Sequence, residues 1–136
     1  MDAGGVPLAC TLTGANEHDV TQLMPLVDAL PPARGKVGAP LRRPKCVMGG
    51  RGDDSDPHRM RLSCRGIRTR IARRGDPHGS GLGVLRYVVE QTLALFHQMR
   101  RLRLRVRYDR SDAVHEAFMK LGCIRICHTR LKNSFF

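Results

Sequence analysis

A carboxylate and a guanidinium group four residues apart are the first residues of this sequence that could do chemistry. Arg86 and Glu90 lie in the segment RYVVEQ, where the 3.6-residue rhythm of apolar residues predicts a helix. Glu90 could coordinate a divalent ion while Arg86 holds a phosphate. The alternative is an ordinary exposed ion pair, which would stabilise the helix by only about 0.3 to 0.5 kcal/mol. The spacing alone favours the ion pair.

A glycine-rich loop after a short apolar strand is the second pattern of interest. The run 46–48 is apolar, Pro44 precedes it, and the loop reads GGRGDD over 49–54. Enzymes that handle phosphates often carry a metal-binding carboxylate at such a strand end, but Gly50 has no side chain. Asp53 lies three residues further on, about 10 Å away along an extended chain. That is too far for a Mg²⁺ ligand shell of about 2.1 Å unless the loop folds back.

Other candidate groups give weaker signals. His97 could act as a general base, but a histidine among arginines tends to stay neutral and solvated. The loop HGSGLG could cradle phosphate through its backbone N–H groups, yet it lacks the Lys-Ser/Thr pair of a P-loop. Cys123, Cys127 and His128 have no second ligand pair at the spacing of a zinc finger. We therefore expect the five cysteines to be reduced and mostly buried, and we expect no covalent hydrolytic chemistry.

The charge of the chain indicates a polyanionic partner. The 136 residues include 24 Lys and Arg against 12 Asp and Glu, a formal net charge of +12, and most of the basic residues are arginine. Because a guanidinium group binds phosphate with two hydrogen bonds, nucleic acid is favoured well ahead of an anionic membrane surface. No run of about eighteen apolar residues predicts a membrane span, and no basic leader indicates a signal peptide. We expect a cytoplasmic protein of one domain.

Seven predicted elements position these groups. Alternating apolar and basic residues over 67–74 predict a half-exposed strand, and the last helix is predicted to bury one apolar stripe. That stripe consists of Val114, Phe118, Leu121 and Ile124. The predicted strands are 6–13, 44–48 and 67–74, and the predicted helices are 15–32, 56–65, 84–103 and 111–131.

Four stretches in fixed order carry a resemblance to a known family. They read DAGGVPLACTLTGANEHDVTQLMPLVDALPP, RIARRGDPHGSGLG, RYVVEQTLALFHQMRRLR and HEAFMKLGCIRIC, and cover nearly the whole chain. Together they resemble the carboxy-terminal part of DDE transposases of the bacterial insertion-sequence-five type. The resemblance implies a ribonuclease H-like α/β fold, a five-stranded mixed sheet flanked by helices. It also implies two Mg²⁺ ions, held by two aspartates and a glutamate, that assist DNA strand cleavage and joining.

The resemblance also implies roles for single residues. The family's glutamate falls on Glu90, and Arg86 stands at the arginine four positions before it. Of the related pattern Y-x2-R-x3-E-x6-K, this sequence keeps only R-x3-E, because Gly83 and His97 stand at the tyrosine and lysine positions. Glu90 is therefore expected to be a residual catalytic and metal-binding residue.

The other two ligands of the family are not found in this chain. The second aspartate belongs to a motif resembling ADRGYD, which here reads GGRGDD. Gly50 takes the place of that catalytic aspartate, Asp53 that of the tyrosine and Asp54 that of the final aspartate. The first aspartate of the family lies on a strand before the DAGG turn, where this chain begins. The resemblance thus implies one partial catalytic domain over 1–136, truncated at its amino-terminal side and lacking the first, central strand.

Three functions are compatible with these observations. The leading hypothesis is an inactive transposase remnant that binds DNA without sequence preference and holds no Mg²⁺ tightly. The second is a non-enzymatic basic protein that binds nucleic acid, or that interferes with an intact transposase of the same family. The third is a surviving nuclease in which Asp53 or Asp54 replaces the lost aspartate. The residues predicted to contact DNA are Arg51, Arg73, Arg74, Arg86, His97, Arg100 and Arg101.

Overall fold

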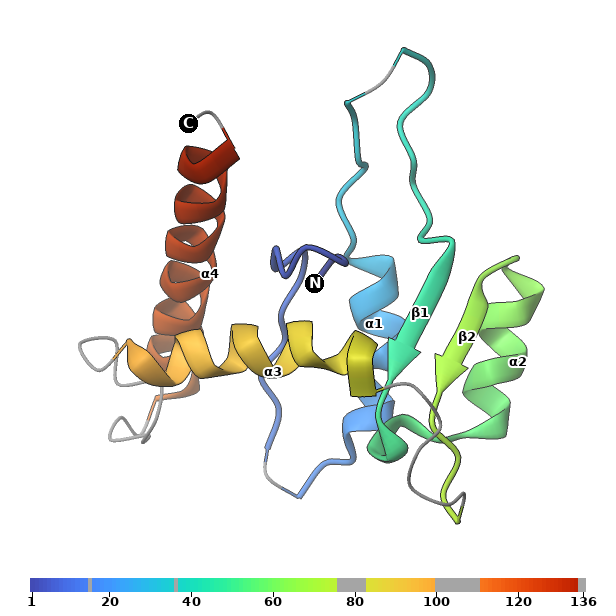
Figure 1. The fold of residues 1–136 in the computed structure, drawn as a ribbon. Coiled ribbons are helices and arrows are strands. Elements are labelled where there is room, and N and C mark those ends of the chain that lie inside the picture. Colours follow the sequence, from blue (N-terminus) through green and yellow to red (C-terminus); the bar gives the residue numbers. More distant parts are fainter. Residues whose placement is uncertain (15, 36, 76–82, 100–110, 135–136) are drawn as a thin grey trace. The chain divides into compact units, whose positions relative to one another are not determined.

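The chain forms two compact units. The computed structural model describes residues 1–14, 16–35, 37–75, 83–99 and 111–134. One unit, here called the helical unit, combines Met1–Leu12 with Val84–Phe136, and the other, the sheet unit, is Thr13–Gly83. Each unit is described by itself, in terms of the elements labelled in Figure 1.

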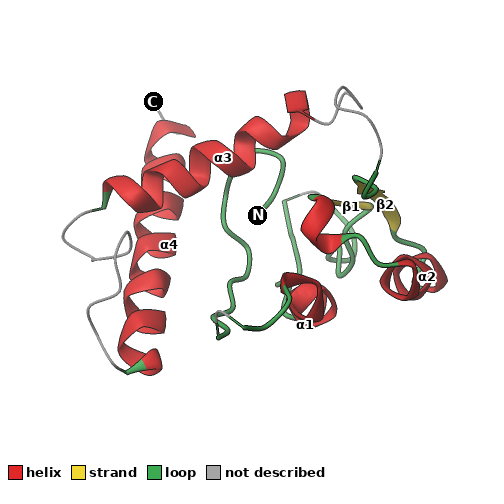
Figure 2. Ribbon diagram, turned by 90° about the horizontal axis from the view of Figure 1, so that it is seen from below, coloured by secondary structure: helices red, strands yellow, loops and turns green. Residues whose placement is uncertain are grey.

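The sheet unit is built on a parallel strand–helix–strand motif. Strand β1 (Cys46–Gly49) leads through helix α2 (Asp56–Cys64) to strand β2 (Arg68–Ile71). The strands pair in parallel, with Cys46 opposite Arg68 and Gly49 opposite Ile71. Before them come a 3-10 helix, Asp19–Gln22, and helix α1, Leu23–Asp28. A second 3-10 helix, Arg51–Asp53, follows β1 directly. Figure 2 shows β1 and β2 in yellow. Among the described residues they form one two-stranded sheet.

Helix α2 begins and ends where its sequence predicts. Pro57 stands in its first turn, where the missing N–H would have no partner in any case. Gly66 adopts φ +70° just beyond the last turn, a conformation that suits glycine. The N–H of Gly66 then donates to Ser63 O at 2.8 Å, and that of Ile67 donates to Leu62 O at 3.0 Å. These two bonds form a Schellman cap, which brings Ile67 back onto Leu62.

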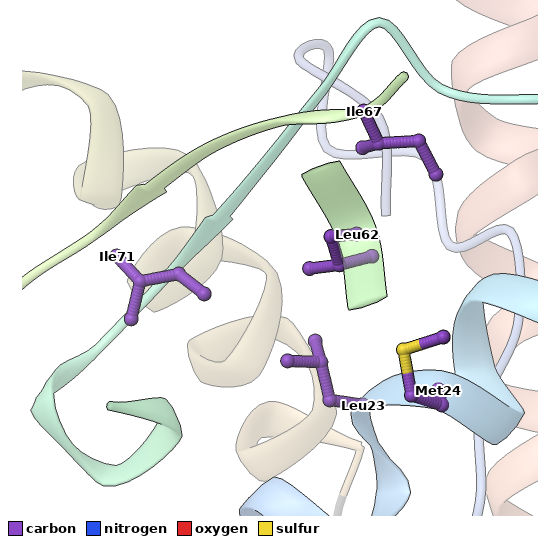
Figure 3. Close-up of a cluster of buried hydrophobic side chains, with 5 residues drawn as sticks. All are labelled: Leu23, Met24, Leu62, Ile67 and Ile71. Atoms are coloured by element: carbon purple, nitrogen blue, oxygen red, sulfur yellow. The ribbon is translucent and has the colours of Figure 1, made fainter. Parts of the chain in front are cut away.

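This contact is part of the core of the sheet unit. Leu62 is fully buried, and the cluster around it comes from α1, α2 and the segment that contains β2 (Figure 3). The partly buried side chains of Val27 and Val47 pack against it. One face of the sheet is thus covered by α1 and α2. The buried members of the cluster are Leu23, Met24, Leu62, Ile67 and Ile71.

The helical unit consists of α3 (Gly83–Gln98), α4 (Asp112–Ser134) and the amino-terminal segment. The buried Thr92 hydroxyl on α3 donates to Gly5 O at 3.2 Å and to Val88 O at 3.0 Å. Gly5 has φ +79°, and a Cβ there would lie 3.0 Å from Thr92 Oγ1, so the close approach requires glycine. On α4, the Cys127 thiol donates to Pro7 O at 3.8 Å. The amino-terminal segment therefore contacts both helices.

Most of the predicted elements are confirmed. The strands at 44–48 and 67–74 and the helix at 56–65 correspond to β1, β2 and α2. Helices predicted at 84–103 and 111–131 correspond to α3 and α4, although residues 100–103 lie outside the described part of the chain. The helix predicted at 15–32 is shorter, because only 19–28 is helical. Within the described ranges, no helix is long and apolar enough to cross a membrane.

Two sequence predictions about the helical unit are wrong. Residues 6–13 form no strand: Pro7 O accepts a hydrogen bond from the Cys127 thiol of α4, and among the described residues no strand pairs with this segment. The stripe predicted to be buried on α4 is also largely exposed: Val114, Leu121 and Ile124 are exposed, and Phe118 is half-buried. The buried side instead includes Ile126, next in sequence to the Cys127 that contacts Pro7.

The fold class is confirmed only in its coarse form. The described chain is mixed α/β, with four α-helices and a two-stranded parallel sheet. The five-stranded ribonuclease H-like sheet stays a prediction. The assignment of 1–136 to a single partial domain also stays a prediction.

Candidate functional site

The loop at the carboxyl end of β1 folds back on itself. Gly50 is extended, with φ −83° and ψ −176°, and the chain then turns into the 3-10 helix Arg51–Asp53. This turn brings Asp53 back to the strand end, where its Oδ2 accepts a hydrogen bond from the Gly50 N–H at 2.9 Å. A Cβ placed on Gly49 would lie 2.8 Å from the same oxygen. The loop thus folds back, and the separation of about 10 Å given for an extended chain does not apply, because residues 51–53 are helical.

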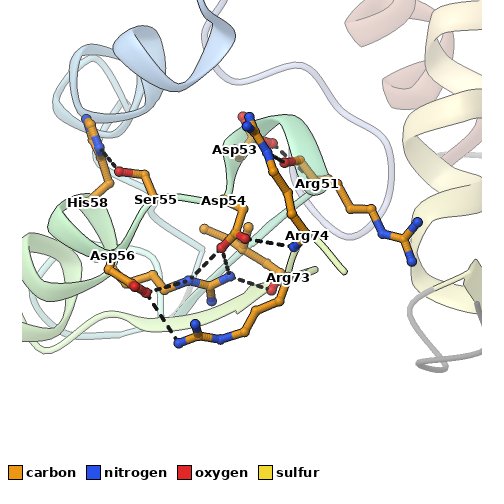
Figure 4. A network of polar contacts seen from close by, with 11 residues as sticks. Arg51, Asp53, Asp54, Ser55, Asp56, His58, Arg73 and Arg74 are labelled. Carbon is orange, nitrogen blue, oxygen red and sulfur yellow. Dashed lines mark hydrogen bonds and ion pairs between the residues drawn. The ribbon is translucent and has the colours of Figure 1, made fainter. Parts of the chain in front are cut away.

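The carboxylate of Asp54 is held by Arg59 and by the backbone of Arg74. Figure 4 shows Asp54 beside Arg74, with their contact dashed. Arg59 Nη2 lies 2.7 Å from Asp54 Oδ1, and both side chains are only about 15% exposed. The N–H of Arg74 donates to Asp54 Oδ2 at 2.8 Å. This N–H, followed by the Arg59 guanidinium, holds the pKa of the Asp54 carboxyl below its ordinary value. Asp54 is therefore a stronger acid than an unpaired aspartate.

The same contacts join the loop after β1 to the loop after β2. Arg59 Nη2 also donates to Ile71 O at 2.9 Å, at the end of β2. Arg74 Nε donates to Arg51 O at 3.1 Å, in the other direction. Arg59 on α2 and Asp54 just before α2 thus hold the two loops together at the carboxyl ends of β1 and β2.

Three arginines predicted to bind DNA come together at this edge. The Arg74 side chain donates through Nε to the backbone oxygen of Arg51, and the Arg74 N–H donates to Asp54. Arg73 is exposed and forms an ion pair with Asp56, its Nη2 lying 3.3 Å from Asp56 Oδ1. Arg51 and Arg74 are 23 residues apart in sequence. They come into contact because β1 and β2 pair in parallel, which places the ends of both strands side by side.

The remaining predicted site residues lie in the helical unit. Glu90 is exposed on α3, and His97 is exposed in its last turn. Arg86 lies in the first turns of α3, but its side chain is outside the described part of the structure, as are Arg100 and Arg101 entirely. Glu90 belongs to the helical unit and Gly50 to the sheet unit. The participation of all these residues in catalysis or DNA binding stays a prediction.

The acidic residues at the strand end do not fit the Mg²⁺ ions that the resemblance implies. Gly50 offers no ligand, Asp53 accepts the Gly50 N–H, and Asp54 is neutralised by Arg59. Within the described ranges, no group of three or more His, Cys, Asp and Glu side chains could hold a metal ion. Mg²⁺ needs several oxygen ligands around one centre, which this loop does not supply.

Sequence reasoning missed the residue that organises the loop. Arg59 was not among the candidate residues, although an arginine on the first turn of a helix that follows Asp54 by five positions is a usable signal. Its side chain is 16% exposed, which for an arginine indicates a specific partner. Because a carboxylate at the start of a helix is often paired with a nearby arginine, Arg59 could have been predicted as a partner of Asp54.

The cysteines of the helical unit form a contact of their own. Burial, and after it the neighbouring Cys10 thiol, raises the pKa of Cys123 to about 12. All five cysteines are free, as predicted, but the expectation that most are buried is wrong. Cys64 is exposed and the other four are half-buried.

Comparison with known proteins identifies a related transposase. The chain is 54% identical, over 133 residues, to a protein of Burkholderia cepacia described as "Putative transposase for insertion sequence element IS402". The alignment covers 98% of this chain and 62% of the relative, so the chain spans somewhat less than two thirds of that protein's length. No family model and no solved structure matches the chain. The relationship to an insertion-sequence transposase is thus confirmed, whereas the insertion-sequence-five type and the DDE chemistry stay predictions.

Proposed function

We propose that this chain is part of a DDE transposase of the insertion-sequence-five type, and that by itself it binds DNA without cutting it. The relationship to a transposase at 54% identity supports the first part. The order of the resembling stretches along the sequence supports the assignment to the DDE type.

The observation that carries the inactivity is the closed loop at the end of β1. Two-ion strand cleavage needs carboxylates that hold both Mg²⁺ ions beside the attacking and leaving oxygens. At this strand end Gly50 has no carboxylate, and Asp54 is neutralised by Arg59. Asp53 is present but serves as the cap of its own loop. Glu90 by itself is a single ligand, and a single ligand cannot organise two ions.

The DNA binding is supported by charge. The net charge of +12 is carried largely by arginine, which binds phosphate bidentately. Binding to phosphates releases counterions, so the affinity should fall steeply as the salt concentration rises. With aromatic residues at 4% of the chain, stacking on bases contributes little, and we expect no sequence preference.

A second candidate function is interference with an intact transposase. The exposed apolar residues of α4 favour it: Leu121 is 51% exposed and Ile124 is 63% exposed on the same helix. Apolar residues exposed together are typical of surfaces that contact another protein. Co-purification with an intact transposase that is lost on Leu121→Asp would favour this second function.

A plasmid assay tests the proposed function. Supercoiled plasmid is incubated with Mg²⁺ or Mn²⁺ and either the natural chain or the Glu90→Gln variant, and binding of a short duplex is followed by fluorescence anisotropy. We expect no nicking above the level without protein, and an affinity that falls by at least roughly tenfold between 50 and 200 mM salt. Nicking that depends on Glu90 would contradict the proposal that the chain does not cut DNA. An affinity that does not change with salt concentration would contradict the proposal that the chain binds DNA through its phosphates.

A further inference from the structure

We propose that the open face of the two-stranded sheet, formed by Met48, Arg68 and Arg70, binds the phosphate backbone of DNA. The inference rests on the proposed function in that DNA is the ligand. It assigns the binding to a surface away from the loop at the strand end, where Arg51, Arg73 and Arg74 lie.

The side chains of β2 alternate between two faces. Arg68 and Arg70 are exposed, whereas Ile71 is buried in the core of the sheet unit. The parallel register places Arg68 opposite Cys46 and Arg70 opposite Met48, so these four side chains share one face. Met48 is 46% exposed. The covered face of this sheet is therefore backed by α1 and α2, and the open face carries two arginines.

Neither of these two arginines has an acidic partner among the described residues. Within the described part of the chain, neither Arg68 nor Arg70 has a side-chain hydrogen bond or an ion pair. By contrast, three other arginines of the same unit are paired with carboxylates. These pairs are Arg59 with Asp54, Arg65 with Asp28 and Arg73 with Asp56.

The charge of the open face decides what can cover it. Parallel sheets are usually covered on both faces, most often by apolar layers. An apolar layer here would remove two unpaired guanidinium groups from water, which costs several kcal/mol for each ion. The occupant must therefore bring negative charge close to Arg68 and Arg70.

The spacing of the arginines suits a strand of phosphates. Side chains two residues apart on one strand lie roughly 6.6 Å from each other on the same face. Successive phosphates along one nucleic-acid strand are separated by a similar distance, so Arg68 and Arg70 can contact neighbouring phosphates. Each guanidinium can donate two hydrogen bonds to one phosphate. An array of regularly spaced anions fits this face better than a single small anion.

The test compares two double variants with the same loss of charge. One is Arg68→Gln with Arg70→Gln, and the other is the matched control, Arg42→Gln with Arg61→Gln. Arg42 and Arg61 are exposed in the same unit and, among the described residues, also have no partner. Binding of a labelled duplex is measured by anisotropy over a range of salt concentrations, and circular dichroism checks that both variants fold. A third variant, Arg68→Lys with Arg70→Lys, keeps the charge.

We expect the sheet-face variant to weaken DNA binding by about tenfold at low salt and to reduce the slope of log K against log salt by about 1.8, the value for two lost phosphate contacts. The control should change affinity by less than about threefold, and the lysine variant should keep the slope. If the natural chain binds DNA and both glutamine variants weaken it equally, the inference fails while the proposed function stands. The inference also fails if the Arg68→Gln, Arg70→Gln variant binds DNA as well as the natural chain does but binds anionic phospholipid vesicles less tightly. Should the natural chain bind no DNA, the proposed function itself fails.

Discussion

The backbone N–H of Gly50 donates to the carboxylate of Asp53 at 2.9 Å, so a carboxylate stands at the end of β1 although residue 50 has no side chain. The contact depends on the single 3-10 turn Arg51–Asp53, which reverses the direction of the chain. It places Asp53 where the family resemblance would put a metal ligand, but with an oxygen already bonded to the backbone. The loop is thereby closed by its own side chain and needs no ion to hold its shape.

Replacing Gly49 by alanine tests how tightly this loop is closed. The added Cβ would meet Asp53 Oδ2 at 2.8 Å and Asp53 Cβ at 3.1 Å, so the loop must shift. We expect Gly49→Ala to lower the free energy of unfolding by about 1 to 3 kcal/mol, the usual cost of overpacking. Urea unfolding followed by circular dichroism measures it.

A double-mutant cycle identifies the cause of that loss. If the clash with the Asp53 carboxylate is responsible, Gly49→Ala should cost less in an Asp53→Ala background, which removes the oxygen at 2.8 Å but keeps the Cβ at 3.1 Å, and the two losses should not add. Additive losses would mean that Gly49 acts through its backbone and not through contact with Asp53.

Asp54→Asn should make the stability of the sheet unit less dependent on pH. The Arg74 N–H and the Arg59 guanidinium lower the folded pKa of Asp54 below its ordinary value of 3.8. The resulting stabilisation is fully present above that value and is lost as the pH falls through the lower folded pKa. The variant should therefore melt at a lower temperature than the natural chain at pH 7.

The acidic limb of the melting curve provides the check on Asp54. Below pH 3.8 the difference between the two proteins should shrink, since protonation removes the same charge from the natural chain. An Asp56→Asn variant is the control, because Asp56 is 73% exposed and lies further from its partners, 3.3 Å from Arg73 and 3.9 Å from Arg59. Equal effects of the two substitutions would contradict the role of Asp54 as the partner of a half-buried arginine.

The thiols should differ sharply in reactivity. Burial and the Cys10 thiol raise the pKa of Cys123 to about 12, and only the thiolate is nucleophilic. Iodoacetamide at pH 8, followed by peptide mass spectrometry, should modify the exposed Cys64 at least about tenfold faster than Cys123. In urea the difference should disappear.

The same pKa also predicts an alkaline limit of stability. A thiol whose folded pKa is raised above its ordinary value of 9.0 stabilises the fold fully below pH 9 and loses this contribution as the pH rises towards 12. Replacing Cys123 by alanine should therefore flatten the alkaline limb of the stability curve. Rapid labelling of Cys123 in the folded chain at pH 8 would contradict the assigned environment.

The sequence predicted those elements whose signals are local. Strand β1 follows from the apolar run 46–48 after Pro44, and strand β2 follows from the alternation over 67–74, all within a few residues. The segment 6–13 has the composition of a strand, but a strand needs a partner, and composition does not say whether one is present. Pro7 in this segment contacts Cys127, and Gly5 just before it contacts Thr92, and both partners are separated from it by most of the chain.

Helix α4 shows a different limit of pattern reasoning. Over its 23 residues, apolar side chains recur on more than one face, so periodicity alone does not identify the buried face. The face with Ile126 is buried and the one with Leu121 is exposed. Sequence reasoning also named Arg51, Arg73 and Arg74 as candidate residues. It did not predict the ion pair of Asp54 with Arg59 or the contact of Arg74 with Arg51, because both depend on the geometry of the loop.

Gly50→Asp would return a side-chain carboxylate to the position of the family's second aspartate. The Asp53 carboxylate already lies beside the backbone of residue 50, so the variant would bring two carboxylates to one strand end. Two carboxylates can hold a divalent ion together with water, and the ion relieves the repulsion between them. We expect Mn²⁺ binding, measured by electron paramagnetic resonance of the free ion, to strengthen by about tenfold or more relative to the natural chain.

The added negative charge must be separated from the geometry of the pair. Ser63→Asp adds the same charge at an exposed position of α2 and should leave Mn²⁺ binding nearly unchanged. Asp53→Asn in the Gly50→Asp background should remove most of the gain, because one carboxylate alone binds such ions weakly. Plasmid nicking should stay absent in all these variants, because two carboxylates at one strand end do not place two ions on the attacking and leaving oxygens. Equal gains in Gly50→Asp and Ser63→Asp would mean that net charge, and not the position of Asp53, governs ion binding at this loop.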